Sequence, residues 1–329
     1  MSLSNTIPHI PTELLIKIFA INPATSDLLS LCLVCRHWTL AARIVLYTDI
    51  CFTHPDQLTL FHYCRAARRH IRSIHFKLTA SVPGYASIVY CFGPATLAGC
   101  TALRFLCVDA ASPARILTAT ILLDLLHSIE GPLENIVLKG YAHTPEVTEA
   151  LAARPTLRSF AIEPRGNYDG QTMHQIRIAP LEIADLEPLT KCTELKQLDL
   201  RYSGQVTDEF LRSVVFKMPR LKELMLGDCT AVTEGCFVEI AEHCPLLRQI
   251  WLWKAEFGET CVETVGRKLV EMKEIWFRRN REKVIWVRSG PPLALYVLLP
   301  ASQTQARAPR PRVESLEREL LIDTLFSFP

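Results

Sequence analysis

The sequence of 329 residues predicts an α/β fold in which short all-α helices at the N-terminus lead into a curved solenoid and then a tail. Three observations predict this fold. After residue 50 one apolar pattern recurs with a period of about 26 residues, which is typical of stacked repeats. Before residue 50 the apolar residues follow helical spacing. Beyond residue 283 the repeated pattern stops. We therefore expect helices at 1–50, a solenoid at 51–283 and a largely disordered tail at 284–329.

The first helix is expected to begin at Pro11, because the fixed φ of proline suits the first helical position. Asn22 and Pro23 are expected to end it. A second helix is expected to begin at Ser26 or Asp27, either of which can cap it. The apolar residues at helical spacing are Leu14, Leu15, Ile18 and Phe19 in the first helix, and Leu28, Leu31, Val34 (or Cys35) and Trp38 in the second. This short helical segment cannot bury a sufficient hydrophobic core alone. We therefore expect its helices to complete their core against another surface.

These N-terminal residues resemble an F-box, because Pro11, the two apolar pairs that follow it and Trp38 fall in the order and spacing of that motif. The family favours leucine before the proline, where this chain has Ile10. Helices of the F-box family pack against the Skp-family adaptor of SCF-type cullin–RING ubiquitin ligases. The adaptor-binding residues that the resemblance implies are Ile10, Pro11, Leu14, Leu15, Ile18, Leu31, Val34, Cys35 and Trp38.

The repeated pattern is an apolar residue, two other residues, a second apolar residue, one other residue and a third apolar residue. Its clearest copies are Leu195-Leu198-Leu200, Leu221-Leu224-Leu226, Leu247-Ile250-Leu252 and Met272-Ile275-Phe277. Weaker copies are Ile71-Ile74-Phe76, Leu103-Leu106-Val108, Leu133-Ile136-Leu138 and Leu157-Phe160-Ile162. The pattern predicts a short strand in each of about seven or eight repeats, with an irregular stretch, a loop or an extra hairpin, around residues 164–190.

The segments between strands repeat as well. Thr207 and Thr233, which lie 26 residues apart, each precede acidic residues and are expected to cap a helix. Pro219 and Pro245 are expected to end those helices. A strand and a helix cannot enclose a core alone but can do so when stacked. We therefore expect parallel strands inside and helices outside.

Residues 192–277 resemble the cysteine-containing class of leucine-rich repeats. Cys192 and Cys244 stand three residues before the first leucine of their repeats, as in that family, and Met218 replaces the cysteine in the repeat between them. Leucine-rich repeats that follow an F-box usually hold the protein to be ubiquitinated. Together the two resemblances imply a substrate-recognition subunit of an SCF-type ligase.

The inner face of the solenoid offers a candidate substrate site, because side chains alternate along a strand. In the last four repeats we expect three columns of side chains on this face, which are Gln197, Glu223, Gln249 and Glu274; Asp199, Met225, Trp251 and Trp276; and Arg201, Gly227, Trp253 and Arg278. Three of the five tryptophans are thus expected at its C-terminal end, beside arginine and glutamate. Exposed aromatic residues beside charges are typical of binding hot spots. The substrate-binding residues that we expect are Arg201, Met225, Gln249, Trp251, Trp253, Trp276 and Arg278. The alternative is that the tail folds over the tryptophans, or that they cap the last repeat.

Composition excludes little but favours a reduced, soluble protein. The net charge is +2, and twelve cysteines are scattered through apolar stretches, where they are expected to be buried, reduced thiols. The N-terminus lacks the pattern of a signal peptide, and no apolar run is long enough to span a bilayer. We expect a cytosolic or nuclear protein without membrane contact.

No motif for catalysis, a cofactor or a metal is found. Cys32 and Cys35 form a CxxC, but a zinc site needs four ligands and no second pair follows at useful spacing. We expect a non-catalytic protein without cofactors. Two alternatives remain open: a repeat scaffold whose N-terminal helices only cap the solenoid, and a nucleic-acid-binding solenoid that uses the basic clusters at 65–72 and 278–281, which we do not favour.

Overall fold

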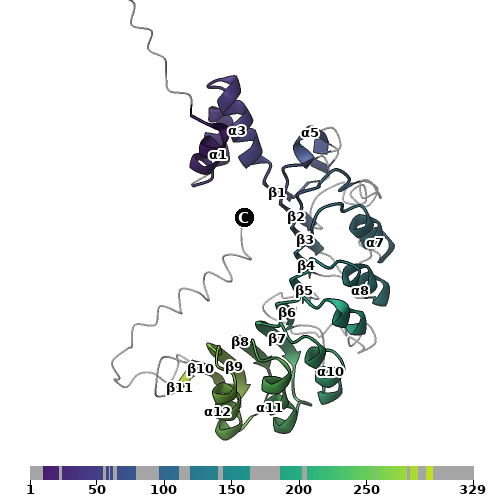
Figure 1. The fold of residues 1–329 in the computed structure, drawn as a ribbon, viewed down its shortest axis with the longest axis vertical. Helices are drawn as coiled ribbons and strands as arrows, with labels where there is room; N and C mark the ends of the chain where they lie inside the picture. The colour runs from purple at the N-terminus through teal and green to yellow at the C-terminus, as the bar shows by residue number, and fades with distance from the viewer. Residues whose placement is uncertain are drawn as a thin grey trace, which may run out of the picture.

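The structure is a computed structural model, and it describes thirteen stretches of the chain. These are residues 10–21, 24–54, 57–58, 60–61, 65–78, 96–110, 119–139, 144–163, 186–201, 206–255, 257–279, 282–287 and 294–298. Figure 1 shows the arrangement: a small helical group at the N-terminal end, followed by an arc whose inner side is lined by strands and whose outer side carries helices.

The N-terminal group contains three helices, α1 (Thr12–Phe19), α2 (Thr25–Leu31) and α3 (Arg36–Leu46). The prediction of a single helix from Ser26 through Trp38 was wrong, because the chain leaves helical conformation between α2 and α3. The Thr39 hydroxyl lies 2.6 Å from the carbonyl oxygen of Cys32 and 2.9 Å from that of Cys35, so it satisfies acceptors at this break. The N-cap of α2 is Ala24, so neither Ser26 nor Asp27 caps the helix.

The helical group has a small core of its own. Leu15, Phe19 and Leu28 are buried against Ala41 and Ala42 of α3, whose small side chains let the helices approach closely. Partly buried residues surround this core, among them Trp38, whose ring meets that of Phe19 edge to face with centroids 5.6 Å apart. A core of this size leaves much of the apolar surface of the helices uncovered.

One sheet runs through the repeats, with its strands in chain order. The first nine strands pair in parallel. They are β1 (Asp49–Phe52), β2 (Ser73–Leu78), β3 (Phe105–Ala110), β4 (Asn135–Lys139), β5 (Ser159–Glu163), β6 (Gln197–Leu200), β7 (Glu223–Asp228), β8 (Gln249–Trp253) and β9 (Glu274–Arg279). The apolar triplets of the sequence are confirmed as the core, since every member whose side chain is described is nearly or fully buried. β1 is an additional strand that the triplet pattern did not predict.

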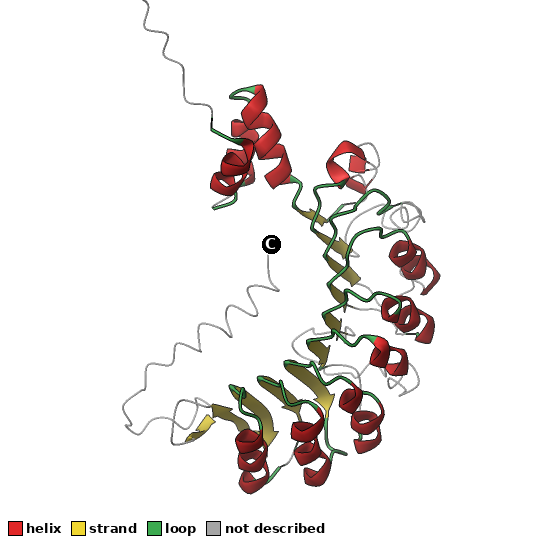
Figure 2. Cartoon of the chain, in the orientation of Figure 1, coloured by secondary structure: helices red, strands yellow, loops and turns green. Residues whose placement is uncertain are grey.

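Helices cover the outer side of the sheet (Figure 2). They are α5 (Arg65–Arg68), α7 (Ala119–His127), α8 (Pro145–Ala152), η1 (Glu187–Lys191), α10 (Asp208–Ser213), η2 (Val215–Lys217), α11 (Glu234–His243) and α12 (Glu259–Lys268). The predicted caps are confirmed: the hydroxyl of Thr207 accepts a hydrogen bond from the N–H of Phe210, and that of Thr233 from the N–H of Cys236, each at 3.2 Å.

Of the two cysteines that precede the leucines, Cys244 contacts the neighbouring repeat. The Cys244 thiol lies 3.4 Å from the carbonyl oxygen of Val215 and 3.7 Å from that of Met218, both in the preceding repeat. Burial raises the pKa of the Cys192 thiol to about 11 and that of Cys244 to about 12, so both thiols are protonated at neutral pH. The expectation of buried cysteines holds here but was wrong for Cys35 and Cys51, which are exposed.

Asp208 links the caps of two successive helices. Its carboxylate accepts hydrogen bonds from the N–H of Thr233 at 2.8 Å and from the hydroxyl of Thr233 at 2.7 Å. Partial burial acts to raise the pKa of Asp208, but the hydrogen bonds from Thr233 outweigh it and hold that pKa below its ordinary value. The lowered pKa means that the ionised carboxylate stabilises the fold above the pKa of the unfolded chain, and that this stabilisation is lost as the pH falls through the folded value.

We therefore expect Asp208→Ala to lower the free energy of unfolding by about 1 kcal/mol at neutral pH, the usual net value of a lost hydrogen-bonded cap. The difference from the wild type should shrink in acid, as the pH falls through the lowered pKa of Asp208 and its carboxyl becomes protonated. Thermal unfolding at neutral and at acidic pH measures this. Glu209→Ala is the matched control, because Glu209 is an exposed acidic residue in the same helical turn. An equal loss in both variants would contradict the cross-repeat role of Asp208.

The sheet continues past the predicted end of the solenoid. β10 (Glu282–Val287) pairs antiparallel with β9, and β11 (Ala294–Leu298) pairs antiparallel with β10. Two strands thus lie within or across the segment at 284–329 that was predicted as a largely disordered tail. The other residues of that tail, and residues 164–185 of the irregular stretch, lie outside the described residues. Within the described part of the chain, no helix has the length and apolar character needed to cross a membrane.

Candidate interaction surfaces

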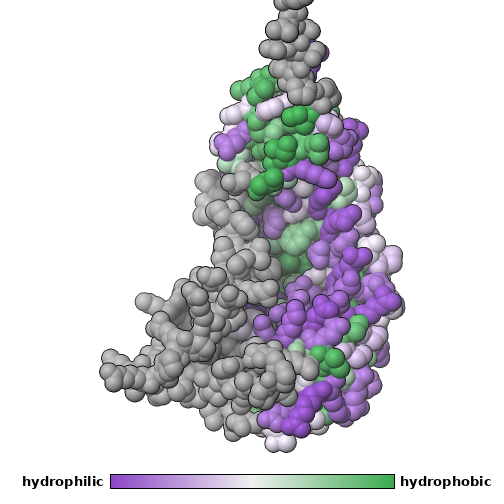
Figure 3. Space-filling model, turned by 60° about the vertical axis from the view of Figure 1, so that its left-hand side comes forward, coloured by the Kyte–Doolittle hydropathy of each residue, from purple (hydrophilic) through white to green (hydrophobic). Residues whose placement is uncertain are grey.

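The helical group carries most of the exposed apolar surface that the structure describes. Eight of the twelve exposed large hydrophobic side chains belong to residues 10–40: Ile10, Leu14, Ile18, Ile21, Leu29, Leu33, Val34 and Leu40. Figure 3 shows this as hydrophobic surface gathered over the helices at the upper end, above a repeat surface that is largely hydrophilic. Contiguous exposed apolar surface on such a small unit is typical of a protein–protein interface.

Helix α1 presents two apolar stripes. Leu15 and Phe19 are buried in the helical core. The residues directly before them are exposed, Leu14 by 50% and Ile18 by 52%. Residues four apart share one face of a helix, so each pair forms its own stripe. The buried stripe holds the helices together, and the exposed stripe is available for a partner.

The predicted adaptor-binding residues divide in the same way. Exposed residues are Ile10, Pro11, Leu14, Ile18, Val34 and Cys35, and partly buried residues are Leu31 and Trp38. Leu15 is only 1% exposed, so it serves the helical core rather than a docking surface. The N-terminal end of this surface is held by His37, whose Nε2 lies 2.8 Å from the carbonyl oxygen of Ile10.

Sequence reasoning missed several members of this surface. Leu33 is 87% exposed because it lies in the break between α2 and α3, which the continuous-helix prediction concealed. Ile21, Leu29 and Leu40 were also missed. A run of apolar residues at Leu28-Leu29 and Leu31 through Val34 could have signalled them, because one face of a helix cannot bury them all.

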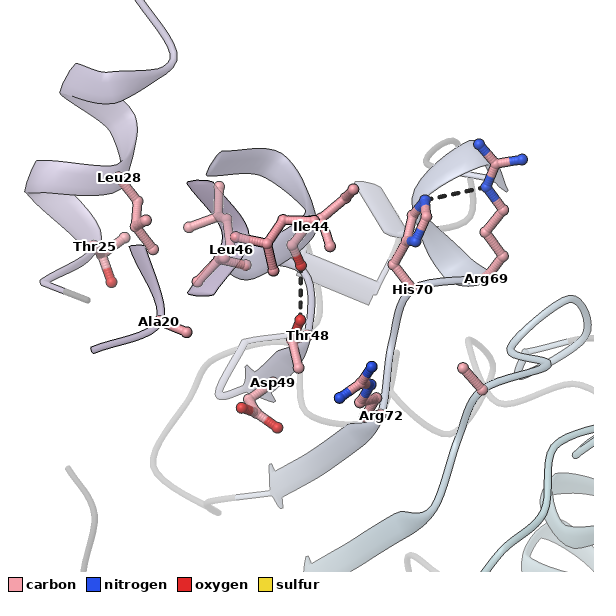
Figure 4. A pocket seen from close by; sticks show the side chains of 13 residues that line it. Ala20, Thr25, Leu28, Ile44, Leu46, Thr48, Asp49, Arg69, His70 and Arg72 are labelled. Carbon is pink, nitrogen blue, oxygen red and sulfur yellow. Dashed lines mark hydrogen bonds between the residues drawn. The ribbon is translucent and has the colours of Figure 1, made fainter. Parts of the chain in front are cut away.

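A pocket of about 470 Å³ separates the helices from the first strands. Figure 4 shows apolar side chains from the helices on one side, including Leu28 and Ile44, and the polar side chains of Asp49, Arg69 and Arg72 on the other. The helices therefore do not bury their apolar faces tightly on the first repeat. Leu14 and Ile18 do not line this pocket, so the exposed stripe of α1 is not the surface that meets the repeats.

The second candidate surface lies on the inner face of the sheet at strands β6 to β9. The register pairs Asp199 with Met225, Met225 with Trp251, and Trp251 with Trp276, which confirms the predicted column. The neighbouring column of Gln197, Glu223, Gln249 and Glu274 is confirmed in the same way. The third column was wrong at one position, since Trp253 pairs with Asp228 instead of Gly227 after a shift in register.

The tryptophans form a rigid group with Arg201. The rings of Trp251 and Trp276 stack with centroids 4.8 Å apart, and the guanidinium of Arg201 lies 5.6 Å from the centroid of the Trp251 ring. Asp199 accepts hydrogen bonds from Arg201 Nε at 3.1 Å and from Nη2 at 2.9 Å, and this bidentate pair balances the charge of Arg201. The arrangement favours an apolar or aromatic partner group over a simple anion.

The predicted substrate-binding residues differ in exposure. Trp253 is 51% exposed, Arg201, Gln249, Trp251 and Trp276 are partly buried, and Met225 is buried. Trp276 Nε1 donates a hydrogen bond to Glu274 at 2.8 Å. The side chain of Arg278 lies outside the described residues. Trp253 is therefore the member of this group that offers the most surface to a partner.

Two other features of the sequence lie within the described residues, the candidate metal ligands and the first basic cluster. No group of three or more His, Cys, Asp or Glu side chains is placed to hold a metal ion there. In the basic cluster at 65–72, the buried Arg68 donates a hydrogen bond to the carbonyl oxygen of Ala98 at 2.9 Å, and its guanidinium lies 4.6 Å from the centre of the Phe61 ring. Arg68 thus ties the first repeats together and is not presented to a nucleic acid.

Comparison with known proteins adds two findings. Residues 7–53 match the family model described as F-box-like. Among solved structures, the chain is similar to an internalin (inlF) from Listeria monocytogenes str. 4b F2365, with 14% identity and a TM-score of 0.37 over 64% of this chain and 62% of that one. The chain therefore spans less than two thirds of that protein. This likeness carries no argument about function, and the repeat architecture follows from the strand order and register themselves.

Proposed function

We propose that this chain, with its F-box-like helices and leucine-rich repeats, is the substrate-recognition subunit of an SCF-type cullin–RING ubiquitin ligase. The helices bind the Skp-family adaptor, and the repeats bind the protein to be ubiquitinated. The chain performs no bond chemistry itself. It acts by proximity, because a target held on the repeats meets the ubiquitin-loaded enzyme at a high effective concentration.

One observation carries this proposal: the exposed stripe of Leu14 and Ile18 lies within the segment that matches the F-box-like family model. The same observation weighs against the alternative in which the helices only cap the solenoid. A cap would bury these two side chains on the first repeat, as terminal caps of solenoids do. In this chain both side chains are about half exposed.

On the repeats, we assign the target site to the inner face around Trp251, Trp253 and Trp276. Large aromatic side chains that are fixed in place lose little conformational entropy on binding, which makes them effective anchors. The stacking of Trp251 on Trp276 and the position of Arg201 above Trp251 hold these rings before any partner arrives.

The experiment is purification of the tagged chain from cells, with two variants. Leu14→Ala combined with Ile18→Ala should remove the co-purifying adaptor, and Trp253→Ala should keep the adaptor but lose ubiquitinated proteins. Trp38 is left unchanged, because its ring packs on Phe19 and its truncation would disturb the helical core.

The matched control replaces two exposed apolar residues of the repeats, Leu246→Ala with Val270→Ala. It should leave the adaptor bound. Adaptor that co-purifies equally with the Leu14 and Ile18 variant would contradict the docking assignment. An unchanged set of ubiquitinated proteins with Trp253→Ala would contradict the target site.

A further inference from the structure

A row of five basic residues crosses the repeats at the N-terminal ends of the strands. We call it the basic rim; its members are Arg158, Lys196, Lys222, Arg248 and Lys273, each placed one residue before β5, β6, β7, β8 and β9. The N–H of each later member donates a hydrogen bond of 2.7 Å to the carbonyl oxygen of the member before it. This continuous backbone ladder places the five residues at equivalent positions on successive strands.

The rim concentrates positive charge that the fold balances only in part. Neighbouring strands lie about 4.8 Å apart, and like charges on adjacent strands destabilise a sheet. The same sheet avoids this elsewhere: toward the other end of its strands Lys77 pairs in register with Asp109, and Asp109 with Lys139, so the charges alternate. A run of five like charges is therefore not a general consequence of the repeat.

Only part of the rim is neutralised within the described residues. Arg158 lies 3.4 Å from Glu134, and Arg248 lies 2.6 Å from Glu271. Lys196, Lys222 and Lys273 form no ion pair within 4.0 Å with another described residue, although the charges of Lys273 and Arg248 act on the nearby carboxyl of Glu223. All five side chains are at least partly exposed, so they can reach a partner.

The rim is close to the tryptophans of the inner face. Arg248 directly precedes β8, and Trp251 lies three residues further along, on the strand. Lys273 and Trp276 have the same spacing at β9. Three residues along a strand span about 10 Å. A peptide that follows the rim can therefore place a neighbouring apolar side chain on the tryptophans.

We propose that the basic rim binds an extended segment of the target protein that is rich in aspartate and glutamate and carries an apolar residue for the tryptophans. This inference rests on the proposed function and specifies the class of substrate. Carboxylates spaced along an extended chain complement cations repeated from strand to strand. A protein segment fits better than a nucleic acid, because Glu271 and Glu223 lie within or beside the row. They would repel a continuous line of phosphates, whereas a peptide can place uncharged residues opposite them.

The test measures binding of a fluorescein-labelled acidic peptide, in which glutamate alternates with glycine around one central leucine, to the full-length chain by fluorescence anisotropy. Wild type should bind the peptide with an affinity that falls as salt rises. Lys196→Glu with Lys222→Glu should weaken binding by about tenfold or more, because two attractions become two repulsions. Lys191→Glu with Lys217→Glu is the matched control: it changes the net charge equally, but both lysines lie exposed on the helical side, in η1 and η2. It should bind within about twofold of wild type if contact rather than bulk charge matters.

Three results would overturn the proposal: no binding of the acidic peptide by the wild type, an equal loss in both variants, or tighter binding of an oligothymidylate than of the peptide. Adding the Skp-family adaptor to the same samples distinguishes this inference from the proposed function. Failure of the adaptor to bind would refute the ligase role, and the peptide result would still decide whether the rim is an acidic-segment site.

Discussion

Phe237→Ala should lower the free energy of unfolding by about 3–5 kcal/mol, the usual cost of removing a buried phenylalanine ring. Phe237 lies on α11, is fully buried, and stacks on Phe257 with ring centroids 4.4 Å apart and planes within 4° of parallel. Alanine would leave a cavity between two repeats, because the stacked strands and helices on both sides can collapse only partly. Equilibrium denaturation in urea measures the loss.

A matched control lies in the same repeat. Leu246 is a large apolar residue that is 38% exposed, so Leu246→Ala should change the free energy of unfolding by much less than Phe237→Ala, within about 1 kcal/mol. If the two variants were equally stable, the contact between Phe237 and Phe257 would not hold neighbouring repeats together as described.

Gly227→Ala should destabilise the fold by about 1–3 kcal/mol and disturb the tryptophan group. A Cβ atom at Gly227 would lie 2.6 Å from the carbonyl oxygen of Arg201 and 3.1 Å from that of Leu200. Both contacts are with backbone, so β6 and β7 must move apart. The glycine also stands where the register between β7 and β8 shifts. Because Arg201 lies over Trp251, we expect the tryptophan fluorescence of the folded protein to change as well.

Gly235→Ala is the control for this prediction. Gly235 lies in α11, and a Cβ atom there would have no neighbour closer than 3.9 Å. Alanine is the better helix former, so this variant should match or exceed the wild type in stability, by up to about 1 kcal/mol. A Gly227→Ala protein with wild-type stability and fluorescence would show that the close approach of the strands is not needed.

The repeats were the predictable part of the fold, for a physical reason. Each strand buries its apolar triplet against the next repeat, so a residue such as Leu198 can occupy only one side of the sheet. The register of Trp251 with Trp276 follows from the same alternation. The shift in strand register at Gly227 could not be predicted from the sequence, because an irregularity of one residue leaves the apolar triplets unchanged.

The N-terminal helices were less predictable, because apolar residues there serve two purposes. Leu14 and Leu15 are identical in chemistry, and only the packing of α1 on α3 decides which one is buried. The break after Leu31 was hidden because Val34 and Trp38 continue the helical spacing. The basic rim was missed for another reason: its members lie about 26 residues apart in sequence and form a row only when the strands stack.

The central claim is that the exposed stripe of α1 binds a Skp-family adaptor. Its most direct test is titration calorimetry of the purified full-length chain with the purified adaptor. We predict that the wild type binds, and that Leu14→Glu with Ile18→Glu weakens the affinity by about a hundredfold or more, because two charges would be buried without partners in the interface. The pair of glutamates should leave the thermal unfolding temperature nearly unchanged, since both side chains are about half exposed. A wild-type chain that does not bind the adaptor, or a variant that binds it as tightly as the wild type, would contradict the claim.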